Sequence, residues 1–524
     1  MKKAKAILSS ILVVAMAVSM ASCSSKASST SSGSSTTTPT SSTTSKPDNS
    51  KFVTINMYNW GDQTNNNWKT VQNAMNDYIK TKTDLNCAIS LHYMTWANWQ
   101  SNYATLLASG QQLDLVNSAS DWLGMWENAG KGAFTDLTPL LPVYAPELYK
   151  QISQDDWKKC MYKGKIICIP ESQYTQWVNH GFMYRGDWAK QAGLSSISTW
   201  DQLGQYFAWI KKNKPGVTPW DASSTNYMYG DGWITSMTMN VPMNIGIDTY
   251  LWALKSPTDM TVITPWTDEA NVDKFAALAK QWGSAGYWST DVLTKSDDSQ
   301  TMLEAGKNGA HQHHVQTFST EKKTMETKQP GSDLEMFGFW QPSGNLEKMT
   351  VTHGATCVGS GSKNPGRALE LMNLIETNKD FYMLLNYGIL NQTYFLNGKG
   401  QVYTPTGFDT NKSGYAADFW GGRLDKFEPQ LATRFDDYQA YSDSLAKIAY
   451  ADPVDGFSYD TTNTANQIAS INQVFTSEMP GIAFGKMSDP TAAVAKLIKD
   501  LKAAGLDTVT ADMQKQLDTW KSQQ

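Results

Sequence analysis

Hydrophobic positions over residues 52–116 follow two alternating periods. Residues 52–59 and 87–93 are rich in β-forming residues, and 113–116 is a short apolar run. Between these runs, apolar residues recur at helical spacing over 68–79 and 99–107. The pattern predicts the order β-α-β-α-β, which is typical of a parallel sheet with helices on its faces.

The rest of the chain adds one strand and several helices. Residues 164–170 form another apolar run, and the spacing predicts helices over 199–212 and near 270–282. Proline at the first helical position predicts two more helices, which open at 364–365 and 489–490. No internal repeat is visible.

The first 22 residues have the pattern of an export signal. Three lysines among the first five residues precede an apolar stretch over 6–18, and Met20-Ala21-Ser22 lead into Cys23. Small residues before a cysteine at this place resemble a bacterial lipobox, in which cleavage leaves the cysteine as a lipidated N-terminus. The alternative is an ordinary secretory signal with an incidental cysteine.

Residues 23–50 are expected to form a lipidated Cys23 followed by a flexible tether. Nineteen of the 27 residues from 24 to 50 are Ser or Thr, and no aromatic residue occurs among them. Such a segment cannot bury enough apolar surface to offset its chain entropy. We therefore expect a lipid-anchored protein at the outer face of the bacterial cytoplasmic membrane, which touches the membrane through its N-terminal lipid only.

Charge and motif content exclude several classes of protein. The 524-residue chain has a net charge of −5 and 18% charged residues, whereas nucleic-acid binding needs concentrated positive charge. After residue 22 no apolar run reaches the ~18 residues of a membrane span. Phosphate-binding loops and the common hydrolase and metalloprotease motifs are absent. Carboxylates are plentiful, but no local arrangement selects a catalytic pair.

Cysteine and histidine patterns predict no metal and no cofactor. Cys160 and Cys168 flank a predicted hairpin turn, where either a disulfide or two buried thiols would fit. His311, His313 and His314 form the one metal-like cluster in the sequence. On a strand, His311 and His313 would share a face and could bind zinc, but no third ligand for that face is obvious. We therefore interpret these histidines as hinge or cleft residues.

The 20 tryptophans and 23 tyrosines exceed what a core requires, and tryptophan follows each of the first three strands. Trp60 with Asp62, Trp96, and Trp122 with Asp121 stand where the carboxyl ends of parallel strands bind ligands. Indole rings beside amide and carboxylate groups suit sugars, whose C–H faces pack on rings and whose hydroxyls need hydrogen bonds. The alternative is that these tryptophans cover the core and the aspartates cap helices.

Several segments carry a family resemblance. They are 164–170 (GKIICIP), 184–188 (YRGDW), 362–368 (SKNPGRA), 385–394 (LNYGILNQTY) and the C-terminal helices around 501–520. Together they resemble the extracellular solute-binding lipoproteins of ABC transporters, in the LplA-like branch of the family 1 sugar-binding proteins. Leu390 and Asn391 depart from the pattern, which has Glu and Gly there.

The resemblance implies a two-lobed, periplasmic-binding-protein-like (type II) α/β fold. Its discontinuous lobes would be joined by hinge strands, with 51–172 plus 312–356 in the first lobe and 173–311 plus 357–524 in the second. Crossings are expected near 171–174, 310–315 and 354–359. Ligand would bind between the lobes of a monomer, and lobe closure would present a surface to the permease of an ABC importer.

The expected function is therefore an oligosaccharide-binding component of an ABC importer, without enzymatic activity or cofactor. A secreted glycan-degrading enzyme and a binding protein for a non-sugar polar solute are the alternatives. The first lobe would contribute the five strand-end residues named above. The remaining predicted ligand-binding residues follow the hinge, face the first lobe or lie in the cleft: Gln173, Tyr174, Trp177, Trp233, Trp266, His314 and Trp340.

Overall fold

The computed structural model describes residues 48–96, 99–172, 177–178, 180–245, 250–296 and 298–523. All of them belong to one compact unit, Lys46–Gln524. The predicted export signal, Cys23 and the tether up to residue 47 lie outside the described residues.

The first lobe is built on a five-stranded sheet in the order β2-β1-β3-β15-β6. β1 pairs in parallel with β2 and β3, and β15 pairs antiparallel with β3 and β6. This confirms the predicted β-α-β-α-β start. The strands are β1 (Val53–Trp60), β2 (Cys87–Met94), β3 (Leu115–Ser118), β6 (Cys168–Ile169) and β15 (Ala355–Cys357).

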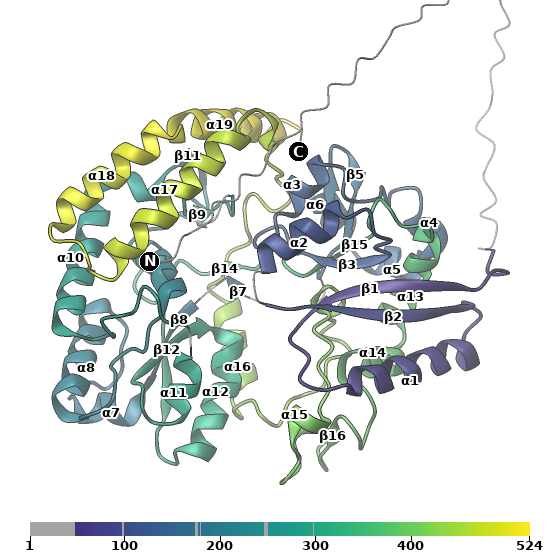
Figure 1. Ribbon diagram of the computed structural model, residues 1–524, viewed down its shortest axis with the longest axis horizontal. Coiled ribbons are helices and arrows are strands. Elements are labelled where there is room, and N and C mark those ends of the chain that lie inside the picture. Colours follow the sequence, from purple (N-terminus) through teal and green to yellow (C-terminus); the bar gives the residue numbers. More distant parts are fainter. Residues whose placement is uncertain are drawn as a thin grey trace, which may run out of the picture. The chain divides into compact units, whose positions relative to one another are not determined.

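Helices cover this sheet because their apolar stripes match its buried residues. In α1 (Asn67–Lys82), Val71, Met75 and Ile79 are fully buried at helical spacing. Figure 1 shows β1 and β2 side by side, with α1 beside them. The other elements of this lobe are α2 (Trp99–Ala108), α3 (Met125–Gly130), α4 (Leu141–Tyr144), α5 (Pro146–Gln151), α6 (Gln154–Lys159), α13 (Pro365–Thr377), α14 (Lys379–Tyr387), α15 (Thr410–Ser413), the 3₁₀ turn η3 (Trp420–Gly422), and the hairpins β4 (Met161–Tyr162) with β5 (Lys165–Ile166) and β16 (Phe395–Leu396) with β17 (Val402–Tyr403).

The second lobe contains two antiparallel sheets, β12-β8-β13 and β11-β10-β9. Figure 1 shows its C-terminal helices α17, α18 and α19, in yellow, packed side by side. Its strands are β8 (His180–Arg185), β9 (Val241–Pro242), β10 (Ala253–Ser256), β11 (Asp259–Ile263), β12 (Ala310–His314) and β13 (Leu334–Gly338). Its helices are α7 (Gly186–Gln191), α8 (Trp200–Asn213), η1 (Ser224–Met228), α9 (Tyr229–Met237), η2 (Pro265–Thr267), α10 (Glu269–Ala285), α11 (Ser299–Glu304), α12 (Val315–Lys328), α16 (Tyr438–Ala446), η4 (Thr461–Asn463), α17 (Ala465–Ala483), α18 (Pro490–Ala503) and α19 (Leu506–Lys521).

Local signals set several helix ends as predicted. The Thr199 hydroxyl accepts from the backbone N–H of Gln202 at 3.2 Å and caps α8. Asp489 caps α18 in the same way through Ala492 at 3.1 Å. Gly505, with φ of 106°, follows α18 in the left-handed region that glycine adopts most easily.

The division between the lobes differs from the prediction. One hydrophobic core draws on residues 55–169 and 355–419, and the others draw on 182–346 and 445–517. Residues 312–346 therefore belong with the second lobe, because β12 and β13 flank β8 along its length. Most of 357–427 belongs with the first lobe, where α13 and α14 pack. The local sequence pattern does not show which lobe each of these segments joins, because sheet pairing connects segments far apart in the sequence.

Short strands lie where the described chain passes between the two lobes. β7 (Trp177–Val178) pairs antiparallel with β14 (Glu347–Lys348), and Glu347 also bridges to Tyr450. The first crossing lies next to the segment expected at 171–174. The crossing expected at 310–315 is wrong, because β12 lies within the second-lobe sheet.

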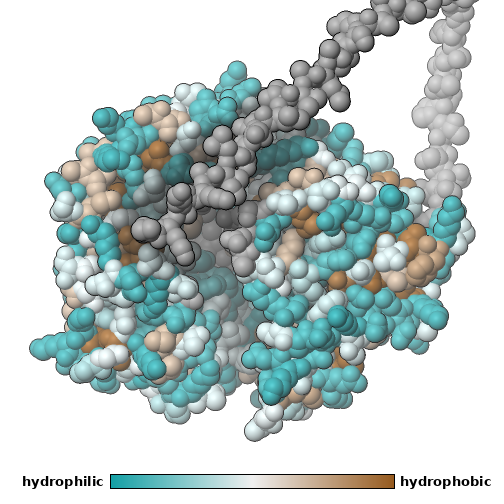
Figure 2. Space-filling view, in the orientation of Figure 1, coloured by the Kyte–Doolittle hydropathy of each residue, from teal (hydrophilic) through white to brown (hydrophobic). Residues whose placement is uncertain are grey.

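The surface and the cysteines complete the description of the fold. The face shown in Figure 2 is mostly hydrophilic, with scattered hydrophobic residues. None of the described helices is long and apolar enough to cross a membrane. Cys87, Cys160, Cys168 and Cys357 are free buried thiols, so the structure has the thiol alternative at Cys160 and Cys168.

Candidate functional site

Four tryptophans form a contiguous cluster at the carboxyl end of the first-lobe sheet. The rings of Trp60 and Trp96 stack with centroids 5.3 Å apart, and Trp122 lies 6.0 Å from Trp60 and 6.1 Å from Trp96. Trp420 of η3 stacks on Trp96 at 5.3 Å and lies 5.4 Å from Trp122. The structure thus brings the three predicted strand-end tryptophans together and adds a fourth. We call these four residues the tryptophan cluster.

The four rings differ in exposure. Trp60 is fully buried, whereas Trp96, Trp122 and Trp420 are half-buried. Trp60, which was predicted to contact ligand, is instead enclosed in the first-lobe core. It packs against the other rings of the cluster, and those three rings present surface to a ligand. A half-exposed ring beside polar groups is what contact with an amphipathic solute requires.

A hydrogen-bonded Asp–His pair borders the cluster. The Asp121 carboxylate lies 2.7 Å from Nδ1 of His353, and the indole N–H of Trp122 donates to the His353 carbonyl at 3.0 Å. Burial opposes the charged imidazole, but Asp121 and Glu171 outweigh it, so the pKa of His353 is raised. The other Asp121 oxygen is buried and has no hydrogen-bond partner in the described part of the chain. Asp121 is thus held in place rather than capping a helix.

Glu171 and Arg423 form an ion pair next to His353. Burial raises the pKa of Glu171, and the Arg423 guanidinium, which donates to that carboxylate, opposes the rise. Arg423 lies 5.9 Å from the ring of Trp420. Gly354 leaves the room that this pair needs, because a Cβ there would collide with the Glu171 carboxylate.

Asp62 occupies the exposed side of the cluster. Its carboxylate accepts from the backbone N–H of Trp96 at 3.2 Å, and its side chain is exposed. Burial and the nearby Asp62 charge raise the pKa of Asp418 to about 6.

Sequence reasoning missed four residues of the site: Trp420, His353, Arg423 and Asp418. They come from loops without periodicity, where no local signal marks them.

Three histidines of the second lobe lie near His353: His180, His313 and His314. The ring of His180 on β8 stacks on His313 at 5.6 Å and meets His314 edge-on at 5.7 Å. Burial lowers the pKa of His314, and His313, His180 and His353 add to the effect. His353 thus lies within electrostatic reach of His314, a predicted cleft residue. Within the described ranges, no group of His, Cys, Asp or Glu side chains has an arrangement suited to a metal ion.

The remaining predicted tryptophans fall elsewhere. Trp233 and Trp266 are 7% and 1% exposed in the second-lobe core, and Trp340 is 4% exposed in the smaller core beside it. The prediction that they line the cleft is therefore wrong, because these rings fill the aromatic interior of the second lobe. Gln173 and Tyr174 lie outside the described residues, and Trp177 is described only as part of β7.

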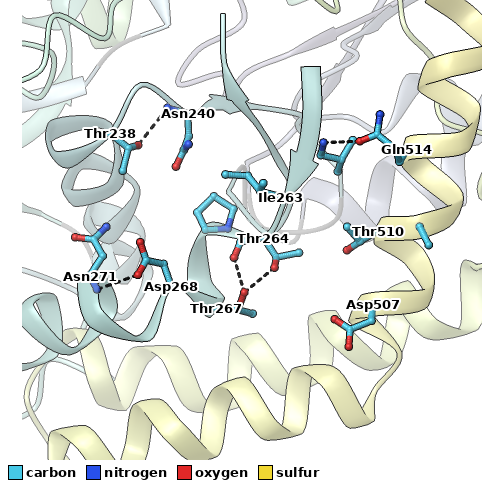
Figure 3. A pocket seen from close by; sticks show the side chains of 13 residues that line it. Thr238, Asn240, Ile263, Thr264, Thr267, Asp268, Asn271, Asp507, Thr510 and Gln514 are labelled. Carbon is cyan, nitrogen blue, oxygen red and sulfur yellow. Dashed lines mark hydrogen bonds between the residues drawn. The ribbon is translucent and has the colours of Figure 1, made fainter. Parts of the chain in front are cut away.

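Among the described residues, two of the cavities are large enough for a ligand. A cavity of about 620 Å³ lies in the second lobe, where Figure 3 shows α19 on one side and the start of α10 on the other. Its polar side chains bond to their own surroundings: Thr264 with Thr267 at 2.7 Å, and Gln514 with the N–H of Val262 at 2.7 Å. A cavity of about 370 Å³ lies in the first lobe and includes Asp62.

Comparison with known proteins places this arrangement in a family. The model of the bacterial extracellular solute-binding proteins matches residues 63–341, and that of a domain of unknown function, DUF3502, matches 453–522. A curated Streptococcus pneumoniae protein, described as a carbohydrate ABC transporter substrate-binding protein, is 23% identical over 487 residues, which cover 90% of this chain and 91% of the relative.

Solved structures share the fold over nearly the whole chain. The N-glycan transport solute-binding protein NgtS of Streptococcus pneumoniae, in complex with Man1GlcNAc, matches with a TM-score of 0.68 and 19% identity over 89% of this chain and 99% of that one. An extracellular solute-binding protein of Bifidobacterium longum subsp. infantis matches with a TM-score of 0.62 and 17% identity over 92% and 100%. Because the family model covers more than half of the sequence, the chain belongs to the bacterial extracellular solute-binding proteins.

Proposed function

We propose that this solute-binding protein captures an oligosaccharide and delivers it to the permease of an ABC importer. The observation that carries the proposal is the tryptophan cluster, with three half-exposed indole rings next to Asp62 and the Asp121–His353 pair. The curated relative is described as a carbohydrate-transporter component, and NgtS was solved with Man1GlcNAc and with Man5GlcNAc. Both descriptions support the same class of ligand.

The charge around the cluster favours a neutral polyhydroxy ligand. Asp62, Asp121, Glu171 and Asp418 lie on or beside it, against Arg423 and His353. An anionic ligand would meet this excess of carboxylates, whereas sugar hydroxyls donate hydrogen bonds to them.

The energies are sufficient for a useful affinity. A micromolar site needs about 8 kcal/mol. Covering two or three rings contributes on the order of 1.5–3 kcal/mol each, and hydrogen bonds to charged groups contribute about 1.5–3 kcal/mol each. Lobe closure and ligand ordering reduce the total.

The finer assignments belong to the same proposal. We place the protein in the LplA-like branch, as a monomer without enzymatic activity. Cys23 would carry the lipid and residues 23–50 would form the tether, at the outer face of the cytoplasmic membrane. The N-terminal pattern and the family's extracellular role support this placement.

Glycan-array binding followed by titration calorimetry tests the function. The array carries mannose-, glucose-, fructose- and xylose-based oligosaccharides, and Man1GlcNAc and Man5GlcNAc serve as named solution probes. We expect reversible micromolar or tighter binding to one series, with the glycan recovered intact. Failure to bind any glycan would overturn the proposal, and release of shortened products would favour the alternative of a glycan-degrading enzyme.

A further inference from the structure

The cavity of about 370 Å³ in the first lobe lies beside the tryptophan cluster and has the size of a small-molecule site. Its walls come from residues 62–65, 387–395 and 402–416, which include the hairpin β16–β17. All of these residues belong to the first lobe. Binding in this cavity therefore does not require the lobes to close.

Aromatic rings form part of its walls. Phe395 packs edge-on against Phe408 at 5.0 Å, and Tyr387 lies 5.9 Å from Tyr394. Six aromatic residues of the lining are all half-buried: Tyr387, Tyr394, Phe395, Tyr403, Phe408 and Tyr415. Of these, only Tyr415 packs against one of the hydrophobic cores. Packing on the hydrophobic cores thus does not explain the other five, which pack on one another and leave part of each ring open to the cavity.

Polar groups accompany the rings, and charge is sparse. Among the described residues, Asp62 is the one charged residue of the lining, which includes no Lys, Arg or His. The amide of Asn411 and the hydroxyls of Tyr394 and Tyr403 have no hydrogen bond to another described side chain or backbone group. Rings with unused amide and hydroxyl groups suit a neutral polyhydroxy solute and give no site for an anion.

Two adjacent segments connect the lining of the cavity to the tryptophan cluster. The N–H of Trp60 donates to the Asp418 carbonyl at 3.4 Å, and the amide of Gln63 donates to the Ala416 carbonyl at 3.3 Å. One segment leads from Trp60 through Asp62 into the cavity, and the other leads back from Tyr415 to Trp420. Asp62 bonds to Trp96 and lines the cavity as well, so it joins the two surfaces.

We propose that this cavity is a second carbohydrate subsite, which holds the distal residues of an oligosaccharide whose first residues lie on the tryptophan cluster. This inference rests on the proposed function and names the part of the site that selects for chain length. Short glycans contact the cluster alone, and longer ones also reach Tyr394, Tyr403 and Asn411.

Titration calorimetry with a short and a long member of the glycan series that the wild type binds tests the subsite. We expect the Tyr394→Ala, Tyr403→Ala double variant to lose at least about tenfold in affinity for the long glycan and less than about twofold for the short one. Asn411→Ala changes an exposed side chain, and we expect it to lower affinity for the long glycan as well, by a smaller factor. Phe52→Ala removes an aromatic that is 64% exposed away from the cavity and serves as the matched control.

Each outcome decides between the two claims. Unchanged affinity of the variants for the long glycan overturns the subsite while leaving the cluster in place. An equal loss for both glycans also overturns it, because the change then acts on the cluster. A wild-type protein that binds no glycan overturns the proposed function itself. Hydrogen exchange supplies a second readout, since the long glycan should protect residues 387–416 and the short one should not.

Discussion

At the scale of single residues, exposure separates side chains that the sequence presents alike. Trp60 ends β1 and Trp122 follows β3 of the same sheet, and their rings lie 6.0 Å apart. Trp60 is fully buried and contributes to the core, while Trp122 is half-buried and presents a face outward. Substitution by alanine should therefore lower ligand affinity at Trp122 and stability at Trp60.

We expect Trp122→Ala to weaken glycan binding at least tenfold with little loss of melting temperature, because its ring contributes contact surface. Trp60→Ala should instead destabilise the fold by about 3–5 kcal/mol, as buried aromatic truncations do. Calorimetry and thermal denaturation of both variants measure these effects. Unchanged affinity in the Trp122 variant would remove that residue from the site.

A buried carboxyl gives a pH-dependent prediction. Burial raises the pKa of Glu376 on α13 to about 8, whereas an unfolded glutamate titrates near 4.3. The folded state thus keeps its proton longer, and stability falls as pH rises between these values, by at most about 1.4 kcal/mol per pH unit. Above about pH 8 both states are ionised and the loss is complete.

We expect Glu376→Gln to flatten this decline, since glutamine does not ionise. The variant should resemble the wild type near pH 5 and be the more stable protein near pH 8. Melting temperatures across this range measure the difference, with exposed Glu269→Gln on α10 as the control. If the melting temperatures of Glu376→Gln and wild type fell equally with pH, the raised pKa of Glu376 would be contradicted.

At the scale of elements, loops without periodicity complete the site. The 3₁₀ turn η3 brings Trp420 to the cluster, and the chain after it brings Arg423 to Glu171. The segment just before β15 supplies His353 and Gly354. These loops are fixed by packing on the sheet, so a small change in their clearance should be felt at the site.

Gly354→Ala tests that clearance. Its Cβ would collide with the buried Glu171 carboxylate and approach the Trp420 carbonyl to 3.1 Å. We expect a loss of about 1–3 kcal/mol in stability, typical of overpacking, together with weaker ligand binding. Gly398→Ala is the matched control, because nothing lies within 4 Å of a Cβ there. Wild-type melting and affinity in the Gly354 variant would show that the clearance is not needed.

At the scale of the whole molecule, the two lobes and the family's extracellular role imply capture of solute outside the cytoplasm. The proposed lipid at Cys23 would keep that capture close to the permease. We expect Cys23→Ser to release the protein from the membrane fraction into the medium or periplasm, and to abolish labelling by a palmitate analogue. A variant that stays in the membrane fraction with its label would contradict the lipobox. Wild type treated with a lipoprotein signal peptidase inhibitor should keep its leader.

The sequence by itself determined the local features of this protein. Hydrophobic periodicity predicted the β-α-β-α-β start, and capping residues such as Thr199 and Asp489 marked helix ends, because both signals act within a few residues. It also placed Trp60, Trp96 and Trp122 at strand ends that meet. The segments that resembled a family predicted the solute-binding membership that the comparison confirmed.

Only the tertiary structure decided which lobe each later segment joins and which tryptophans remain accessible. β12 pairs with β8 across more than a hundred residues, and Trp420 reaches a cluster whose other members lie hundreds of residues earlier. Trp233 and Trp266 look like Trp122 in sequence, yet they fill the second-lobe core. Burial depends on all the segments that pack around a ring, and a local pattern carries no information about partners that distant.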